Sequence, residues 1–261
     1  MVKTNNTHFY KSQFGQDKFV IKKVLNYKKG GYFVDIGAYD GVHLSNTYAL
    51  EKMLDWRGIC VEPSKKFFDL TKNRNCLCIQ AAAGPDSDTM IQFLYYGQSP
   101  ALSGNISTIS NHLKMEDLIG SEALEMKTVS LYDLLKKNNA PKYIDYLNID
   151  TEGYEYEILK NFKFDEYKFG VITVEHNNNV NLKKGLYSLL KKNGYIRIAQ
   201  IKCYEDWYVA PELFKIRLLN VSVIKEIDRS IVNIRIWFIN QLKKKAPRFY
   251  DFLKKHVTVK P

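Results

Sequence analysis

The chain has 261 residues and a formal net charge of +11, with 45% hydrophobic and 26% charged residues. These values are ordinary for a soluble globular protein with one large domain and a modest extension, and no apolar run approaches the roughly 20 residues that span a bilayer. The N-terminal residues Met1-Val-Lys-Thr-Asn-Asn6 lack an apolar signal core, so we expect an intracellular, cytoplasmic protein. Four cysteines without C-x-x-C pairing exclude a zinc-finger signature and predict free, buried thiols.

The positive charge is concentrated near the C-terminus. Residues 211–261 carry twelve Lys and Arg against four Asp and Glu, a net charge of +8, which leaves +3 for residues 1–210. A nearly neutral main part disfavours a groove that tracks nucleic-acid phosphates through an active site. We therefore predict a domain over residues 1–210, followed by a basic amphipathic extension over residues 211–261.

Between residues 32 and 210, short β-like runs alternate with helix-length segments. The runs are Tyr32–Ile36, Gly58–Val61, Leu77–Ala82, Tyr146–Ile149, Gly170–Val174, Tyr195–Ile201 and Trp207–Val209. Helices are expected at 45–54, 65–72, 130–137, 154–160 and 182–192. This alternation predicts a doubly wound, mostly parallel α/β sheet, and the last two runs, with no helix between them, predict an antiparallel hairpin at its end. Residues 97–126 are predicted to form a long loop or short hairpin near the site.

The first run leads into a loop, Gly37-Ala-Tyr-Asp-Gly41, in which the glycines permit a tight turn and close approach to a ligand. A dinucleotide site instead has G-x-G-x-x-G facing an anionic pyrophosphate. Here Asp35 and Asp40 flank the loop and would repel phosphate. They favour a cationic nucleotide such as S-adenosylmethionine, which has an ammonium and a sulfonium; an ordinary strand–turn–helix capped by an aspartate is the alternative. The nearby His43 is expected to belong to the helix entry rather than to catalysis.

Two further strand ends would complete a nucleotide pocket. Glu62 follows the second run, twenty-one residues beyond Gly41, where a carboxylate can accept hydrogen bonds from both ribose hydroxyls. A surface acid that caps a helix is the alternative. The third run ends at Gln80 and Ala81, which would receive the adenine edge or serve helix–sheet packing.

Acidic residues gather at the ends of the next two runs. The fourth run delivers Asp150 and Glu152, and the fifth delivers Glu175, His176 and Asn177. Because ligands bind at the carboxyl ends of strands in open α/β sheets, these side chains are expected to face one another.

Several motifs together resemble the FkbM-type S-adenosylmethionine-dependent methyltransferases, over residues 12 to about 210. They are Ser12-Gln-Phe-Gly-Gln-Asp17, Gly31-Tyr-Phe-Val-Asp-Ile-Gly-Ala-Tyr-Asp-Gly41, Ser45-Asn-Thr47, Leu50-Glu51, Trp56-Arg-Gly-Ile-Cys-Val-Glu-Pro63 and Asn148-Ile-Asp-Thr-Glu-Gly-Tyr-Glu155. Each motif is modest alone, but all occur in the right order on the right predicted elements. The resemblance implies a Rossmann-like class I methyltransferase fold and O-methylation of hydroxyls on sugars, glycan or glycolipid units, or polyketides.

The resemblance also implies which residues hold the cofactor. They are Asp35, Gly37, Gly41 and Glu62, with Gln16 and Asp17 closing over its methionine end. From their positions in the loop and at the strand ends, Ala38, Tyr39, Gln80, Ala81 and Asp150 are also expected at the cofactor.

A sugar hydroxyl is a poor nucleophile, and a positioned base typically adds 10²–10⁴-fold to the rate. His176 is the first candidate for this base and Asp150 the second, while Glu152 and Glu175 would orient the acceptor. A structural histidine at the end of the fifth strand is the alternative for His176. A second possibility is that Asp150, Glu175 and Asn177 ligate Mg²⁺, since oxygen ligands suit a hard divalent metal.

The extension carries an apolar stripe at helical spacing, Ile224, Ile227, Ile231, Ile234 and Phe238. Its partner would be the protein's own core or a second subunit, an anionic membrane surface, or, less favoured, nucleic acid. An RNA ribose 2′-O-methyltransferase is the rival function, but such enzymes present a Lys-Asp-Lys-Glu tetrad, and Glu175-His176 stand where a lysine is expected. A non-catalytic interaction module is disfavoured because the predicted cofactor residues are all present.

Overall fold

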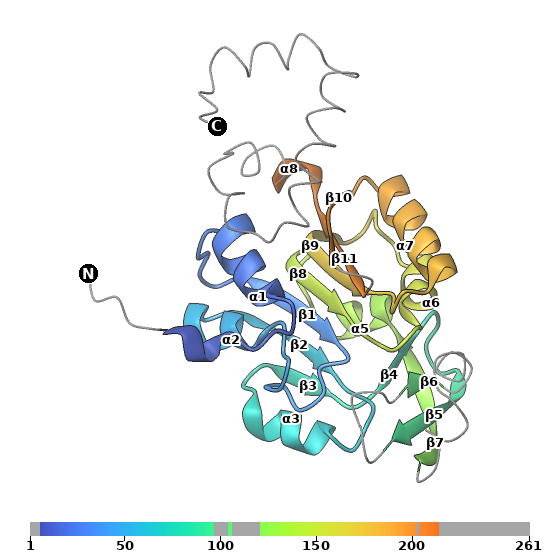
Figure 1. Cartoon of the computed structure of the whole chain (residues 1–261). Helices are drawn as coiled ribbons and strands as arrows, with labels where there is room; N and C mark the ends of the chain where they lie inside the picture. The colour runs from blue at the N-terminus through green and yellow to red at the C-terminus, as the bar shows by residue number, and fades with distance from the viewer. Residues whose placement is uncertain (1–5, 97–103, 106–120, 202–203, 214–261) are drawn as a thin grey trace, which may run out of the picture.

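The computed structural model describes residues 6–96, 104–105, 121–201 and 204–213. A seven-stranded sheet with the order β10-β11-β9-β8-β1-β2-β3 organises the molecule (Figure 1). Its strands are β1 (Tyr32–Ile36), β2 (Arg57–Val61), β3 (Leu77–Ile79), β8 (Tyr143–Ile149), β9 (Lys168–Glu175), β10 (Ile196–Ile201) and β11 (Glu205–Val209). Neighbours from β3 to β9 run parallel, whereas β11 is antiparallel to both β9 and β10. The predicted Rossmann-like fold, including its antiparallel hairpin, is confirmed.

Helices cover both faces of this sheet because apolar side chains alternate along its buried strands. On β1, Phe33 packs with one set of helices and Val34 with the other. The first set is η2 (Phe19–Val24, a π-helical segment directly after α1, Gln16–Lys18), α2 (Tyr48–Leu54) and α3 (Phe67–Asn73). The second set is α5 (Leu131–Lys137), α6 (Glu155–Lys160) and α7 (Val180–Lys192). All five predicted helices are present, whereas α1, η2 and the short 3₁₀ helix η1 (Asn6–Phe9) were not expected.

A second, four-stranded sheet with the order β4-β7-β5-β6 was also not expected. It contains β4 (Ala82–Gly84), β5 (Met90–Tyr96), β6 (Gly104–Asn105) and β7 (Ser121–Ser130). The single strand predicted over Leu77–Ala82 is wrong, because the chain leaves the large sheet after Ile79 and pairs with β7 from Ala82 onward. The long loop or short hairpin predicted over residues 97–126 is only partly right, because residues 104–105 form β6 and residues 121–126 belong to β7, and both strands pair with β5. Residues 97–103 and 106–120 of that prediction lie outside the described residues.

Of the predicted basic extension, the structure describes only α8 (Pro211–Leu213), so the predicted stripe and its partners lie outside the described residues. Within the described part of the chain, no helix has the length and apolar character to cross a membrane. The thiols of Cys60, Cys76 and Cys78 are free, but only Cys60 is fully buried, and the other two are partly exposed.

Candidate active site

A cleft opens at the carboxyl ends of β1, β2 and β8, where open α/β sheets bind their ligands. Counting its open mouth, it holds about 970 Å³ of empty space. Apolar side chains from both sheets form its walls, among them Ala81 from the β3–β4 connection and Ile91 and Phe93 from β5. Apolar walls with a few polar groups are typical of small-molecule sites.

The glycine loop between β1 and α2 forms one side of this cleft. Gly37 has a φ of +86°, and a Cβ placed on it would lie 1.8 Å from the backbone oxygen of Asp150. Gly41 has a φ of +78°, and its Cβ would lie 2.6 Å from Cγ of Arg74. Both positions therefore exclude other residues, sterically and conformationally. The first contact brings the loop directly against the end of β8.

Glu62 is 6% exposed at the end of β2 and lines the cleft. The backbone nitrogen of Tyr39 donates to Oε2 and that of Ser64 donates to Oε1, each at 2.8 Å. Burial raises the pKa of Glu62, while the Ser64 side chain and these two backbone hydrogen bonds oppose the rise. A carboxylate has about four acceptor positions, so about two remain for a ligand. The loop residues Ala38 and Tyr39 also line the cleft.

Asp35 lies beneath the loop and is 2% exposed. It accepts hydrogen bonds from Thr47 Oγ1 at 2.6 Å and from Asn148 Nδ2 at 2.9 Å. Burial raises its pKa, whereas Thr47, the guanidinium of Arg74 and Asn148 act in the opposite direction. Asp35 lines the cleft, but its carboxylate is thus already held by the protein.

Four predicted cofactor residues, Gln16, Asp17, Gly41 and Gln80, do not line the cleft. Gln80 is exposed, while its neighbour Ala81 does line the cleft. Gln16 and Asp17 are both buried. Gln16 Nε2 donates to Glu205 Oε2 at 2.9 Å, and the Asp17 carboxylate accepts from Ser12 Oγ at 2.5 Å. These side chains therefore stabilise the N-terminal segment.

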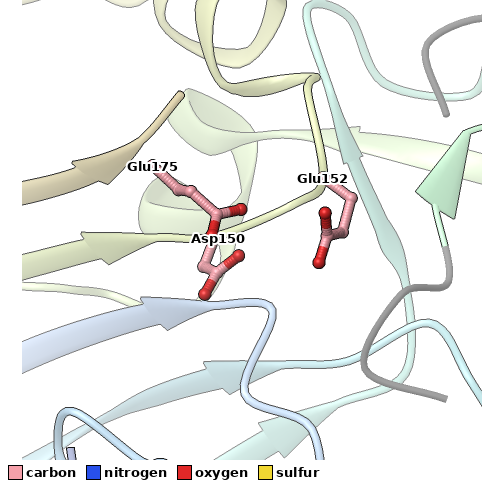
Figure 2. Close-up of side chains that lie close together, drawn as sticks. All are labelled: Asp150, Glu152 and Glu175. Carbon is pink, nitrogen blue, oxygen red and sulfur yellow. The ribbon is translucent and has the colours of Figure 1, made fainter. Parts of the chain in front are cut away.

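The predicted acidic residues meet at the ends of β8 and β9, next to the glycine loop; Asp150 and Glu152 line the cleft, and Glu175 does not. One oxygen each from Asp150, Glu152 and Glu175 lies within 4.8 Å of the others; we call these three residues the acidic cluster. Figure 2 shows Asp150 and Glu175 at the ends of neighbouring strands, with Glu152 facing them from the following loop. Among the described residues, Lys and Arg side chains form no ion pair with this cluster.

Burial and mutual repulsion shift the pKa values of the acidic cluster upward. Burial, followed by the charge of Asp150, raises the pKa of Glu152 to about 8. Burial, Asp150 and Glu152 raise the pKa of Glu175 well above its usual range. Asp150 is also raised by burial, while its hydrogen bond with Glu175 acts in the opposite direction. The cluster therefore retains protons near neutral pH, as interacting carboxylates do.

The loop after β8 is shaped to present Glu152. Glu152 has a φ of 58° and Gly153 a φ of 106°, and a non-glycine residue in the left-handed region is disfavoured by about 1–2 kcal/mol. The buried carboxylate of Glu155 supports this turn, since its Oε1 accepts from the backbone nitrogens of Thr151 and Gly153 at 2.8 and 3.1 Å. Strain supported in this way is frequent at functional sites.

Asn177 presents its amide nitrogen, not its oxygen, to the acidic cluster. Nδ2 donates to Glu152 Oε2 at 2.8 Å and to Glu175 Oε2 at 2.9 Å. The predicted Mg²⁺ set of Asp150, Glu175 and Asn177 is therefore not assembled, because a metal binds the amide oxygen. The side chains close enough to share a divalent ion are those of the acidic cluster, but the Asn177 hydrogens point toward two of its members.

His176 lies away from the cleft. Its side chain is 1% exposed, it is not among the cleft-lining residues, and Nε2 lies 3.5 Å from Asp206 Oδ1. Asp206 also accepts from Arg197 Nη1 at 2.9 Å. This arrangement matches the structural alternative for His176, with Asp206 as its neighbour.

In the cleft, predicted cofactor residues of the glycine loop and Glu62 lie together with Asp150 and Glu152 of the acidic cluster. A profile of the methyltransferase FkbM domain matches residues 35–197, from β1 into β10. The chain belongs to the FkbM methyltransferase family. It is thus an S-adenosylmethionine-dependent methyltransferase, and the resemblance inferred from its motifs is confirmed.

Solved structures related to this FkbM family member are distant. An FkbM methyltransferase from Methylobacillus flagellatus KT is 13% identical with a TM-score of 0.43, and the match covers 74% of this chain and 50% of that chain. M. capricolum TrmK in complex with S-adenosyl-homocysteine is 14% identical with a TM-score of 0.43, and the match covers 94% of this chain and 95% of that chain. Precorrin-6y C5,15-methyltransferase from Geobacter metallireducens GS-15 is 12% identical with a TM-score of 0.41, and the match covers 80% of this chain and 97% of that chain. No curated protein matches the sequence.

Several cleft residues of this family member escaped the sequence analysis. His43, which we assigned to the helix entry, lines the cleft, as do Asn46, Phe93 and Tyr154. Phe93 was detectable in principle, because Met90-Ile-Gln-Phe-Leu-Tyr-Tyr96 is a β-prone run. Asn46 belongs to the Ser45-Asn-Thr47 motif, which supported the family resemblance but whose residues were assigned no role.

Proposed function

We propose that this methyltransferase transfers a methyl group from S-adenosylmethionine to a hydroxyl of a sugar, a glycan or a related small molecule. The observation that carries the proposal is the contact between Gly37 and the backbone of Asp150. This contact puts the acidic cluster directly beside the loop where the cofactor is expected. A proton acceptor next to the methyl donor is what a weakly nucleophilic hydroxyl requires.

The cleft residues fit the cofactor. Gly37 lets the backbone approach the ligand closely, Glu62 retains acceptor positions for the ribose hydroxyls, and Ala81 and Phe93 offer apolar contact for the adenine. When bound, S-adenosylmethionine supplies an activated methyl group on a sulfonium. The protein's contribution is to align the acceptor oxygen with that methyl group.

In this proposal Glu152 takes the proton from the acceptor hydroxyl. It lines the cleft, and its pKa of about 8 lies close to a working pH, where a general base is most effective. Burial, followed by repulsion from Asp150, maintains this pKa. His176, our first candidate from sequence, is replaced in this role because it is buried outside the cleft.

The charge of the cleft favours a neutral polyol over RNA. The described residues that line it include Asp35, Glu62, Asp150 and Glu152 but no Lys or Arg. An acidic cleft repels a phosphate backbone, whereas carboxylates accept hydrogen bonds from sugar hydroxyls.

The test is transfer of labelled methyl from S-adenosylmethionine to three acceptor pools: sugars and nucleotide sugars, glycolipids, and RNA. We expect label in a sugar-containing pool, stable to mild alkali because a methyl ether, unlike a methyl ester, is not hydrolysed. Label in RNA, alkali-labile label, or no transfer to any pool would contradict the proposal.

Repeating the transfer assay with EDTA tests the metal alternative. We expect turnover to change less than about twofold, because Asn177 already satisfies two carboxylates of the cluster through its amide hydrogens. Loss of turnover on chelation, restored by Mg²⁺, would assign the acidic cluster to a metal.

A further inference from the structure

Asn46 carries a buried hydrogen-bond acceptor that the described protein atoms leave unsatisfied. The residue lies in the chain between the glycine loop and α2, is 7% exposed and lines the cleft. Its Oδ1 has no hydrogen-bond partner in the described structure. Leaving such an acceptor unpaired is unfavourable, and native proteins rarely do so without a ligand or functional reason. A ligand in the cleft is therefore expected to donate a hydrogen to this oxygen.

A chain of buried hydrogen bonds determines which atom of Asn46 faces the ligand. Asn148 Nδ2 donates to the Asp35 carboxylate at 2.9 Å, so Asn148 Oδ1 must face the other way. That oxygen accepts from Thr173 Oγ1 at 2.7 Å, and Thr173 is in turn 2.7 Å from the Tyr146 hydroxyl. Only the amide nitrogen of Asn46 can then bond to Asn148 Oδ1, as it does at 2.9 Å. The Asn46 oxygen is thereby left as a pre-oriented acceptor.

The strand order indicates which part of the cofactor reaches this acceptor. β1 lies between β2, which ends at Glu62, and β8, which carries Asn148. A cofactor whose ribose is held at Glu62, with its adenine toward Ala81, therefore extends its amino-acid end across β1 toward β8. Of the two charged groups at that end, only the ammonium has hydrogens to donate. Asp35 and Asp150 make this region favourable for a cation.

We propose that Asn46 is a recognition residue for the α-ammonium group of S-adenosylmethionine, accepting its hydrogen bond through Oδ1. The inference rests on the proposed placement of the cofactor in the cleft and adds an amine subsite to it. Asn46 would position the methionine end, and with it the sulfonium, relative to Glu152.

Calorimetric titration of the full chain with three ligands tests the inference without turnover. The ligands are S-adenosylhomocysteine, its analogue with hydrogen in place of the amino group, and 5′-methylthioadenosine, which lacks the whole amino-acid portion. Wild-type protein should bind S-adenosylhomocysteine about tenfold or more tightly than the deamino analogue, as expected for a hydrogen bond to a charged group. Asn46→Ala should remove most of this preference and change the affinity for 5′-methylthioadenosine by less than about twofold.

Two control variants separate the possible failures. Asn73→Ala removes a donor that bonds the backbone oxygen of Asp40 in the same loop from outside the cleft, and it should leave the preference intact. Glu62→Ala should weaken all three ligands together. If Glu62→Ala and Asn46→Ala both leave every affinity unchanged, the cofactor placement fails, and the inference fails with it.

Other results overturn the inference alone. Equal binding of S-adenosylhomocysteine and the deamino analogue by wild-type protein would do so, whatever the stability of the variants. So would a uniform loss of affinity for all three ligands in Asn46→Ala while Glu62→Ala behaves as expected.

Discussion

The two sides of the cleft hold carboxylates in opposite ways. On the glycine-loop side, Glu62 receives two backbone N–H groups, and Asp35 receives a hydroxyl and an amide. In the acidic cluster, Asn177 is the donor to both glutamates, and the nearest charges are other carboxylates. Burial raises the pKa values on both sides, but the hydrogen-bond donors around Asp35 and Glu62 oppose this rise, whereas the neighbouring carboxylates add to it at Glu152 and Glu175.

Burial alone therefore does not assign a role to a carboxylate. Donors that surround a carboxylate favour its ionised form and hold it in a defined geometry, which suits recognition of ligand hydroxyls. Carboxylates that face one another retain a proton near neutral pH and can exchange it, which suits catalysis. The comparison is open to test in four ways.

Gly37→Ala should have the largest effect, because it forces the two sides apart. The added Cβ would lie 1.8 Å from the Asp150 backbone oxygen, in a left-handed conformation. We expect a loss of unfolding free energy of more than about 3 kcal/mol and a loss of S-adenosylhomocysteine affinity of at least about 100-fold, measured by thermal unfolding and calorimetry.

Gly194→Ala is the matched control. Its φ of +88° is almost the same, but no atom lies within 4 Å of the added Cβ. It should lose only the conformational term of about 1–2 kcal/mol. Equal destabilisation by the two variants would show that the contact with Asp150 is unimportant.

Glu152→Gln should separate catalysis from cofactor binding. Removing the proposed base should lower kcat by about 10²–10⁴-fold, while S-adenosylhomocysteine affinity changes less than about threefold, because the glycine-loop side is untouched. Single-turnover methyl transfer and calorimetry measure the two quantities. Glu157→Gln, on the nearby α6 but not lining the cleft, should retain full activity. Retention of more than about half the wild-type rate in Glu152→Gln would remove Glu152 as the base.

The pH dependence of stability should report the raised pKa of Glu152. The folded protein holds a proton on Glu152 up to about pH 8, whereas the unfolded chain releases it near pH 4.5. This contribution to stability is therefore fully present below pH 4.5 and is lost as the pH rises to about 8, by at most about 1.4 kcal/mol per pH unit for one proton.

Chemical denaturation between pH 5 and 8 should show a smaller decline for Glu152→Gln than for wild-type protein. Asp150→Asn provides the second measurement, because loss of the neighbouring charge should move the apparent pKa of the reaction rate to lower pH. An unchanged decline in Glu152→Gln would place the titrating proton on another member of the acidic cluster.

Gln80→Ala should have the smallest effect. The sequence suggested an adenine contact, but the side chain is exposed and outside the cleft. We expect a change in S-adenosylhomocysteine affinity of less than about twofold and in unfolding free energy of less than about 0.5 kcal/mol. A fivefold loss of affinity would return Gln80 to the cofactor site.

Local patterns predicted the large sheet well, because short β-like runs alternate along the chain with helix-length segments. The run from Tyr32 to Ile36 matches β1 at both ends, and the hairpin of β10 and β11 follows from the missing helix between them. The small sheet was missed because β4 and β5 are completed only by pairing with β7, whose partner residues lie 46 positions beyond those of β4 and 25 to 37 positions beyond those of β5. Such pairing depends on tertiary contacts rather than on local propensity.

The family could be inferred from the order of the motifs, and the fold and the positions of the glycine loop, Glu62 and the acidic residues from the local pattern of strands and their ends. What each side chain faces depends on the tertiary structure. It buried His176 beside Asp206, turned the Asn177 nitrogen toward the acidic cluster, and left the Asn46 oxygen unpaired in the cleft. The physical reason is that the role of a polar group depends on its burial and its partners, which come from elements far apart in the chain.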